Sequence, residues 1–324
     1  MSPAHAATLV FAFALAAALL YYSLRGIEWR RVGRLVSGAS PALLAAVAAM
    51  TMLTTFLRAW RWRVLLNAEA RVGLSSAFWA TAAGLFGNNF LPARAGELVR
   101  TYMISAEHDI GKAYVLATAL AERVADAIVL VTIAAMVLLM IPSPPGWLES
   151  AARPFAALGL VGAGAIAILP FLGPLLERVI ARAPLPPAIQ TRLIATVEQG
   201  LRGLRAFHDA GRLSIFLGMA LVIWALDAVG AVIGGAALGL HIPIPVAFLL
   251  IAGLGLGSAL PSTPGYVGIY QFVAVSVLKP FGFRAEDALA YILVVQAIGY
   301  LVIGFWGGLG LARYRLILRS GRSG

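Results

Sequence analysis

The long apolar stretches of this chain constrain its fold more than any other feature. A helix that crosses a bilayer needs about 20 mostly apolar residues, because the hydrocarbon core is about 30 Å thick. Of the 324 residues, 61% are hydrophobic and only 12% are charged, whereas soluble domains are about 25% charged. The sequence predicts an all-α integral membrane protein that forms a single polytopic domain over residues 1–324. Six full spans are expected, at Ala4–Leu24, Pro41–Leu57, Lys112–Ile141, Phe155–Leu176, Leu213–Leu240 and Ala285–Ala312.

Two further apolar stretches are interrupted by a Leu-Pro-x-x-x-Gly element. They are Ser75–Leu91 and Ile244–Leu260, and they are followed by the short helical segments Gly96–Ser105 and Gly265–Leu278. Proline removes a backbone N–H and disfavours helix in the residue before it, so each first half-helix should stop just before its proline. We interpret each pair as a re-entrant hairpin made of a broken helix. An ordinary kinked span is the alternative.

The two broken segments match each other without a gap. Residues 83–96 read AGLFGNNFLPARAG and residues 252–265 read AGLGLGSALPSTPG, with Ala, Gly, Leu, Leu, Pro and Gly at identical offsets. The repeat elements cover about residues 75–106 and 244–280, and three expected spans lie between them. An odd number of spans places the two hairpins on opposite faces, which is the inverted-repeat arrangement of many transporters.

The Lys and Arg residues predict the orientation. With a cytoplasmic N-terminus, the inner segments hold 17 of them and the outer segments 7, in agreement with the positive-inside rule. We expect a protein of the bacterial inner membrane with both termini in the cytoplasm. The exception is the first outer loop, where Arg25, Arg30, Arg31 and Arg34 suggest an interfacial helix.

The segment 187–208 has the pattern of an amphipathic helix. Its apolar residues, among them Ile189, Leu193 and Leu201, fall on one helical arc, and its Arg residues lie off that arc. It is expected either to rest on the cytoplasmic leaflet beside anionic lipid or to pack on the protein's own inner end.

Composition narrows the classes of partner. The formal net charge is +11, but the Arg residues lie between apolar stretches, which is typical of topology signals and lipid headgroup contacts rather than of nucleic-acid binding. The chain has no cysteine and four scattered histidines, so we expect no metal site and no cofactor. Membrane lipid is the expected partner, and a homo-oligomer is possible.

The first break carries candidate binding residues. A helix N-terminus presents free N–H groups and partial positive charge to an anion. Arg94 is expected beside the terminus of the second half-helix, where its fork of donors would fit a phosphate, with Asn88, Asn89 and Glu97 nearby. Arg100 is expected to point toward the cytoplasmic headgroups. Alternatively, Arg94 only neutralises Glu97.

Charged residues inside the spans form a second candidate group. Glu122 lies about 15 Å along its span from Lys112, near mid-bilayer, where an isolated charge is costly. Arg123 and Asp126 are spaced to pair along the helix, which leaves Glu122 to face Arg94, Arg100 or a water-filled cavity. Purely structural pairing is the alternative.

Asp227 lies midway along another span. It is interpreted as a counter-ion for Arg94 or as a site of coupled protonation, and the sequence leaves both open.

The second break and one Arg-Trp segment at a span end supply the remaining candidate residues. Ser262 or Thr263 suits an N-cap, Pro264 suits the first turn, and Gly265 ends the element. Tyr266, Tyr270 and Gln271 follow at helical spacing and either line the same cavity or pack between helices. The run RAWRWRVLL at residues 58–66 alternates Arg and Trp, which is typical of interfacial anchoring.

These motifs also carry a resemblance. RAWRWRVLL, GNNFLPARAGELVR, ERVADAIVL and LPSTPGYVGIYQ resemble, in this order, the flippase-like transmembrane domain of lysylphosphatidylglycerol synthases, from about residue 50 onward. The resemblance implies translocation of lipid between leaflets. In the bifunctional members a soluble C-terminal domain performs aminoacyl transfer. This chain ends at Gly324, just past its last expected span, so we do not expect lysyl transfer.

The sequence thus predicts a flippase-like lipid transporter without a catalytic site, which binds an anionic or phosphate-headed lipid between two hairpins. A membrane-embedded enzyme acting on a lipid-phosphate or polyprenyl carrier is one alternative. A non-catalytic scaffold of a lipid-synthesis complex is the other.

Overall fold

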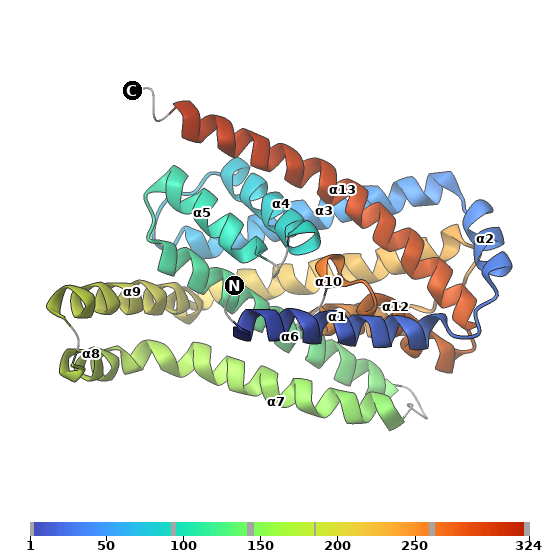
Figure 1. Ribbon diagram of the computed structural model, residues 1–324, viewed down its shortest axis with the longest axis horizontal. Helices are drawn as coiled ribbons and strands as arrows, with labels where there is room; N and C mark the ends of the chain where they lie inside the picture. Colours follow the sequence, from blue (N-terminus) through green and yellow to red (C-terminus); the bar gives the residue numbers. More distant parts are fainter. Residues whose placement is uncertain (1–2, 92–94, 141–145, 185, 259–262, 321–324) are drawn as a thin grey trace.

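The described part of the chain is helical throughout. The computed structural model describes residues 3–91, 95–140, 146–184, 186–258 and 263–320, and these contain no strand. The helices form an elongated bundle (Figure 1). They are α1 (Pro3–Leu24), α2 (Trp29–Ser37), α3 (Pro41–Leu66), α4 (Leu74–Phe90), α5 (Gly96–His108), α6 (Lys112–Met140), α7 (Gly146–Ile168), α8 (Gly173–Arg182), α9 (Pro187–Arg205), α10 (Ala210–Ala237), α11 (Ile244–Gly257), α12 (Ile269–Leu278) and α13 (Ala285–Ser320).

Four helical stretches of the described residues are long and apolar enough to cross a membrane. They are Pro41–Leu66, Gly159–Arg182, Ala210–Ala237 and Ala285–Arg315. Apolar side chains cover the outside of the bundle, for example Leu139 at 89% exposure. This is the surface expected of a protein solvated by lipid, and it establishes the membrane class. The count of six full spans stays a prediction.

Helix α6 is 29 residues long, which corresponds to about 43 Å at 1.5 Å per residue. It carries Glu122, Arg123 and Asp126 in its middle. Helix α3 continues to Leu66 rather than ending near Leu57, because no helix breaker interrupts residues 58–66. As a result, the Arg-Trp run belongs to the helix interior and not to a flanking segment.

Helices α4 and α5 form the first hairpin. Leu91 ends α4 in an extended conformation, with φ −97° and ψ 148°. The Ser76 hydroxyl near the start of α4 donates to the Glu107 carboxylate near the end of α5 at 2.8 Å, so the two helices run back along each other. At the tip, the Gly96 N–H donates to the Asn88 side chain at 3.1 Å. The prediction that helix stops at the first break is confirmed.

Helices α11 and α12 form the second hairpin, and here the expected helix start was wrong. A single 3₁₀ turn at Pro264–Tyr266 has Thr263 at its N-cap position and Pro264 in its first turn, as expected, but α12 begins only at Ile269, with Gly268 as its N-cap. Ser262 lies outside the described residues. Gly265 and Gly268 have φ of 71° and 89°. These left-handed conformations, which glycine adopts readily, prevent one continuous helix from Gly265 onward.

The two hairpins open toward opposite ends of the bundle. The open end of α4–α5 lies with Val72, Ile110 and Phe207 in one apolar cluster, at the end that carries α9 and the C-terminus (Figure 1). The open end of α11–α12 lies with Val246 and Leu278 in another cluster, beside the start of α13. Within the described residues, α4 contacts the 3₁₀ turn Pro264–Tyr266, so the segments that flank the two breaks meet in the bundle.

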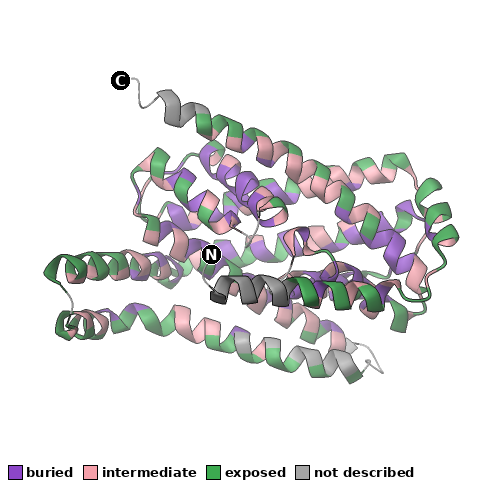
Figure 2. Cartoon of the chain, in the orientation of Figure 1, coloured by how far each residue is buried: buried purple, intermediate pink, exposed green. Residues whose placement is uncertain are grey.

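Two peripheral segments also take defined positions. The final turns of α9 pack on α6, where Leu201 and Phe207 are buried, while Ile189 and Leu193 near its start remain exposed. Packing on the protein's own inner end is thus confirmed for the last part of the amphipathic segment, and contact of its first part with the leaflet stays a prediction. In the Arg-rich first loop, α2 is tied to α13, since Arg31 pairs with Asp287 at 2.9 Å. Figure 2 shows the exposed character of α7, α8 and α9 against the buried faces of α4 and α10.

Close packing of α13 on α4 yields a prediction. A Cβ at Gly307 would collide with the Cβ of Phe86 and would lie 2.6 Å from the Ala82 carbonyl oxygen, whereas a Cβ at the neighbouring Gly308 would meet nothing within 4 Å. Gly307→Ala should lower stability, because overpacking costs about 1–3 kcal/mol. Gly308→Ala should leave it unchanged or raise it, because alanine restricts the unfolded chain. Thermal unfolding in one detergent measures both, and equal midpoints would contradict the packing.

Candidate functional site

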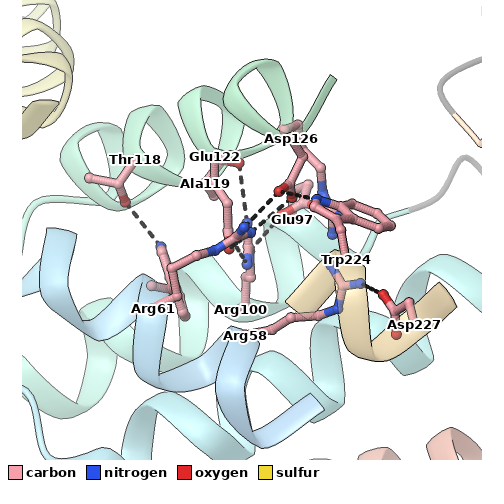
Figure 3. A network of polar contacts seen from close by, with 12 residues as sticks. Arg58, Arg61, Glu97, Arg100, Thr118, Ala119, Glu122, Asp126, Trp224 and Asp227 are labelled. Atoms are coloured by element: carbon pink, nitrogen blue, oxygen red, sulfur yellow. Dashed lines mark hydrogen bonds and ion pairs between the residues drawn. The ribbon is translucent and has the colours of Figure 1, made fainter. Parts of the chain in front are cut away.

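Arg61 lies at the centre of a buried charge network (Figure 3). It projects from α3 and is fully buried. Its Nη1 and Nη2 atoms donate to the two Asp126 oxygens at 2.6 and 2.8 Å, and Nη2 also donates to Glu122 at 2.8 Å. Both carboxylates come from α6, one helical turn apart. The guanidinium fork matches such a bidentate contact, so Arg61 fixes α3 against α6.

Arg100 extends the network to α5. Its Nη1 atom lies 2.9 Å from Glu122 and its Nε atom 2.5 Å from Glu97, and its guanidinium stacks over the Trp62 ring at 4.4 Å. The expectation that Arg100 points toward headgroups was wrong, because the residue is buried. The proposal that Glu122 faces Arg100 is confirmed, and Glu122 is shared between Arg100 and Arg61.

Arg123 pairs with Glu97 across helices rather than with Asp126 along its own helix. The Arg123 Nε atom donates to Glu97 at 2.8 Å. Asp126 faces α3 and also accepts from the Trp224 Nε1 atom of α10 at 3.3 Å. The expected Arg123–Asp126 pair was therefore wrong. The two side chains lie on different sides of α6, since that of Arg123 is 42% exposed and that of Asp126 only 7%.

Asp227 of α10 has a partner that the sequence analysis missed. The Arg58 Nη2 atom donates to Asp227 at 2.5 Å, and the Arg58 guanidinium stacks over the Trp224 ring at 4.7 Å. Both side chains of this pair are partly exposed. Arg58 is thus a counter-ion of Asp227.

These contacts form an alternating chain of three guanidinium groups and three carboxylates. The Arg58–Asp227 pair lies beside this chain and is joined to it through Trp224, which contacts both Arg58 and Asp126. We refer to the eight charged groups together as the array. An isolated charge inside a membrane is expensive, and a buried pair is tolerable only when its hydrogen bonds are satisfied. Alternation places each charge beside an opposite one and leaves the array neutral. Its members are Arg58, Arg61, Arg100, Arg123, Glu97, Glu122, Asp126 and Asp227.

A cavity of about 290 Å³ lies next to the array and is lined by residues that flank both breaks. Asn88 and Asn89 lie in the last turn of α4, before the first break. Ser258 follows α11, and Tyr266 and Tyr270 come after the second break. The remaining lining combines polar and apolar residues. It includes Thr51, Thr54, Thr55, Leu85, Trp224, Ile251, Leu254, Ile292, Val295, Gln296 and Tyr300.

The charged lining of this cavity consists of Arg58, Arg123 and Asp227. These are two guanidinium groups and one carboxylate, and Glu97, which balances Arg123, is not among the lining residues. Arg123 bonds to Glu97 through Nε, and its exposed side chain faces the cavity. The cavity is therefore suited to an anionic group that has both polar and apolar neighbours.

Of the residues that follow the second break, some line the cavity and others hold the lining residues in place. Tyr266 and Tyr270 stack with ring centroids 4.8 Å apart and line the cavity. Gln271 is buried behind them, where it accepts from the Gly268 N–H at 2.7 Å and donates to Gln296. The Gly265 carbonyl accepts from Gln296 at 2.6 Å and from the Tyr300 hydroxyl.

The half-helix termini have fewer free N–H groups than expected. Asn88 accepts from Gly96, and Gln271 accepts from Gly268. Thr263 donates to the Val267 carbonyl at 2.9 Å and takes no part in the α12 cap. Arg94 lies outside the described residues. Within them, no three His, Asp or Glu side chains gather closely enough to hold a metal ion.

A signal for the two missed arginines was present in the sequence. Glu122, Asp126 and Asp227 are carboxylates inside apolar segments, and each needs a cation. Arg58 and Arg61 lie three residues apart on one helical face. Together with the lone carboxylates, this spacing could have favoured a buried network over an interfacial anchor.

Comparison with known proteins shows the family of the chain. A model of the family described as the lysylphosphatidylglycerol synthase TM region matches residues 9–307, so the chain belongs to this family. The glycosyltransferase AglD of Haloferax volcanii is 30% identical over 315 residues, which cover 85% of this chain and 49% of that protein. The chain thus spans about half the length of the curated relative it matches. No solved structure matches.

The buried network predicts an order of stabilities. Arg61→Met leaves Asp126 and Glu122 buried without this partner, and breaking a buried ion pair costs about 3–5 kcal/mol. Arg58→Met should cost less, because Asp227 borders the cavity and water can solvate it. Adding Asp126→Asn to Arg61→Met should restore part of the loss. Thermal unfolding in one detergent checks the order, and equal shifts for the two single variants would refute it.

Proposed function

We propose that this protein is a lipid translocase of the flippase-like type, which moves an anionic or phosphate-headed lipid between the leaflets of the inner membrane. The observation that carries the proposal is the cavity lined by residues that flank both breaks and bordered by Arg58, Arg123 and Asp227. Membership of the lysylphosphatidylglycerol synthase TM family supports an association with membrane lipid.

In this proposal the two hairpins are re-entrant and enter from opposite faces of the membrane. Their opposite opening ends support this inverted arrangement, as does the match between residues 83–96 and 252–265. Both termini would lie in the cytoplasm. A headgroup would then reach the bilayer interior from either face, while its acyl chains remain in lipid beside the apolar lining.

Arg123 is the proposed main headgroup ligand. It is held by Glu97 on one edge and faces the cavity with its remaining donors. A guanidinium can contact two oxygens of a phosphate at once. Asn88, Asn89, Tyr266 and Tyr270 would surround the headgroup, and Arg94 would add charge at the same break. The fully buried Arg61 would hold the helices in place rather than touch the lipid.

A second candidate function is enzymatic action on a lipid-phosphate or polyprenyl carrier. It is favoured by the similarity to a protein whose name describes it as a glycosyltransferase. An enzyme of this kind would turn over a labelled carrier lipid in detergent, where leaflet exchange has no meaning. Product formed in detergent by the wild type, but not by Arg123→Gln, would favour this second function.

The transport proposal predicts the behaviour of Arg123→Gln. Proteoliposomes that contain labelled phosphatidylglycerol should exchange it between leaflets faster than empty vesicles. Arg123→Gln should slow the exchange at least about tenfold, because the loss of a charge-assisted contact worth about 1.5–3 kcal/mol corresponds to that factor or more.

The matched control is Arg30→Gln, which removes the same charge from an exposed position on α2. It should exchange lipid at the wild-type rate. Equal exchange by the wild type and empty vesicles, tested with and without ion gradients, would count against the translocase.

The inverted hairpins predict which side labels single cysteines. The chain contains no cysteine, so each introduced thiol is the sole target. Ala106→Cys lies at the open end of α4–α5 and Lys279→Cys at that of α11–α12, both at exposed positions. A membrane-impermeant maleimide should label Ala106→Cys from the cytoplasmic side only and Lys279→Cys from the opposite side only. Labelling of both from one side would rule out the inverted arrangement.

A further inference from the structure

A second polar pocket lies at the end of the bundle that carries α9. It has a volume of about 180 Å³ and shares no lining residue with the cavity between the breaks. A buried water occupies about 30 Å³, so this pocket has room for a group the size of phosphate. Its lining residues are Ala68, Glu69, Tyr114, Arg202, Arg205, Ala206 and Arg212.

The charges of this pocket are not balanced. Three guanidinium groups face one carboxylate, a formal excess of two positive charges. Arg202 pairs with Glu69 at 2.9 Å. Arg205 donates to a neutral acceptor, the Pro170 carbonyl, at 3.1 Å. Within the described ranges, no carboxylate lies within ion-pair distance of Arg205 or Arg212. This contrasts with the neutral array around Arg61.

The backbone that carries these arginines is fixed by packing. Arg205 ends α9 and Arg212 lies in the first turn of α10, and only the 3₁₀ turn Ala206–His208 and Asp209 separate the two helices. Phe207 of this turn is buried and packs edge-on against Phe216 at 5.1 Å. On the opposite wall, the Tyr114 hydroxyl donates to the Leu65 carbonyl at 2.9 Å. The backbone positions from which the three arginines reach the pocket are therefore fixed, although the side chains of Arg202 and Arg205 are themselves exposed.

Like charges held close together raise the free energy of the empty pocket, and a bound anion relieves this repulsion. A phosphate group carries close to two negative charges and offers several acceptor oxygens to guanidinium forks. A carboxylate would neutralise only one of the two surplus charges. The chemistry of the pocket thus favours phosphate over a simple carboxylate.

We propose that the pocket formed by Arg202, Arg205 and Arg212 is a phosphate-binding site, separate from the cavity between the breaks. The phosphate belongs either to a water-soluble phosphate compound or to the headgroup of an anionic lipid in the adjacent leaflet. The proposal does not depend on lipid translocation.

The test uses the full-length protein in nanodiscs and two probes. Inorganic pyrophosphate is titrated by calorimetry into nanodiscs of phosphatidylcholine alone. Retention of phosphatidylglycerol is measured by native mass spectrometry after reconstitution in a mixture with phosphatidylcholine. The main variant is Arg212→Gln, because within the described residues the Arg212 side chain forms no ion pair or hydrogen bond that the fold would lose. Arg205→Gln is the second variant.

The matched control is Arg192→Gln, an exposed position on α9 outside the pocket. Arg212→Gln and Arg205→Gln should weaken the binding of one probe at least about tenfold, and Arg192→Gln should leave it unchanged. If the affected probe is pyrophosphate, the source is soluble, and if it is phosphatidylglycerol, the source is lipid. The proposal would be overturned if Arg212→Gln, Arg192→Gln and the wild type bound both probes equally. It would also be overturned if the wild type bound neither probe.

Discussion

The contact of Arg61 with Asp126 and Glu122 fixes α3 against α6, and the arrangement of the neighbouring helices depends on this pair. Three hydrogen bonds of 2.6–2.8 Å join α3 to α6. Through Glu122 the same contact reaches Arg100 on α5, and through Asp126 it reaches Trp224 on α10. Apolar packing alone is a weak guide to helix arrangement in a membrane, because lipid tails are as apolar as the helices. A buried guanidinium with two carboxylates specifies which faces must meet.

Periodicity and helix breakers were enough to predict most elements from the sequence. The apolar stretches became helices, and α4 ends at its Leu-Pro break as expected. The start of α12 was misplaced because Gly265 and Gly268 adopt positive φ, and several conformations of a Pro-Gly segment are compatible with its sequence. Whether the hairpins enter a membrane from opposite faces stays a prediction.

The site was predicted less well than the fold, since ion-pair partners depend on how helices are rotated about their axes. Residues three apart, such as Arg123 and Asp126, can pair along a helix, but burial turned them toward different neighbours, Glu97 and Arg61. Arg58 and Arg61 were assigned to an interfacial anchor because their helix was expected to end before them. Glu122 was expected to face Arg94, Arg100 or a water-filled cavity because of its depth, and of these Arg100 is the partner found. The binding roles of Asn88, Asn89, Arg94, Tyr266 and Tyr270 remain predictions.

The caps on the half-helix termini have a consequence for selectivity. Asn88 and Gln271 each accept one N–H near the starts of α5 and α12, so these two backbone donors are occupied within the protein and are not offered to a bound group. The side chains that line the cavity therefore contribute more to the recognition of a bound group. They can be substituted one at a time while the capped starts of α5 and α12 keep their conformation. Relatives that share this scaffold can therefore differ in the wall of the cavity at a few positions without any change of fold.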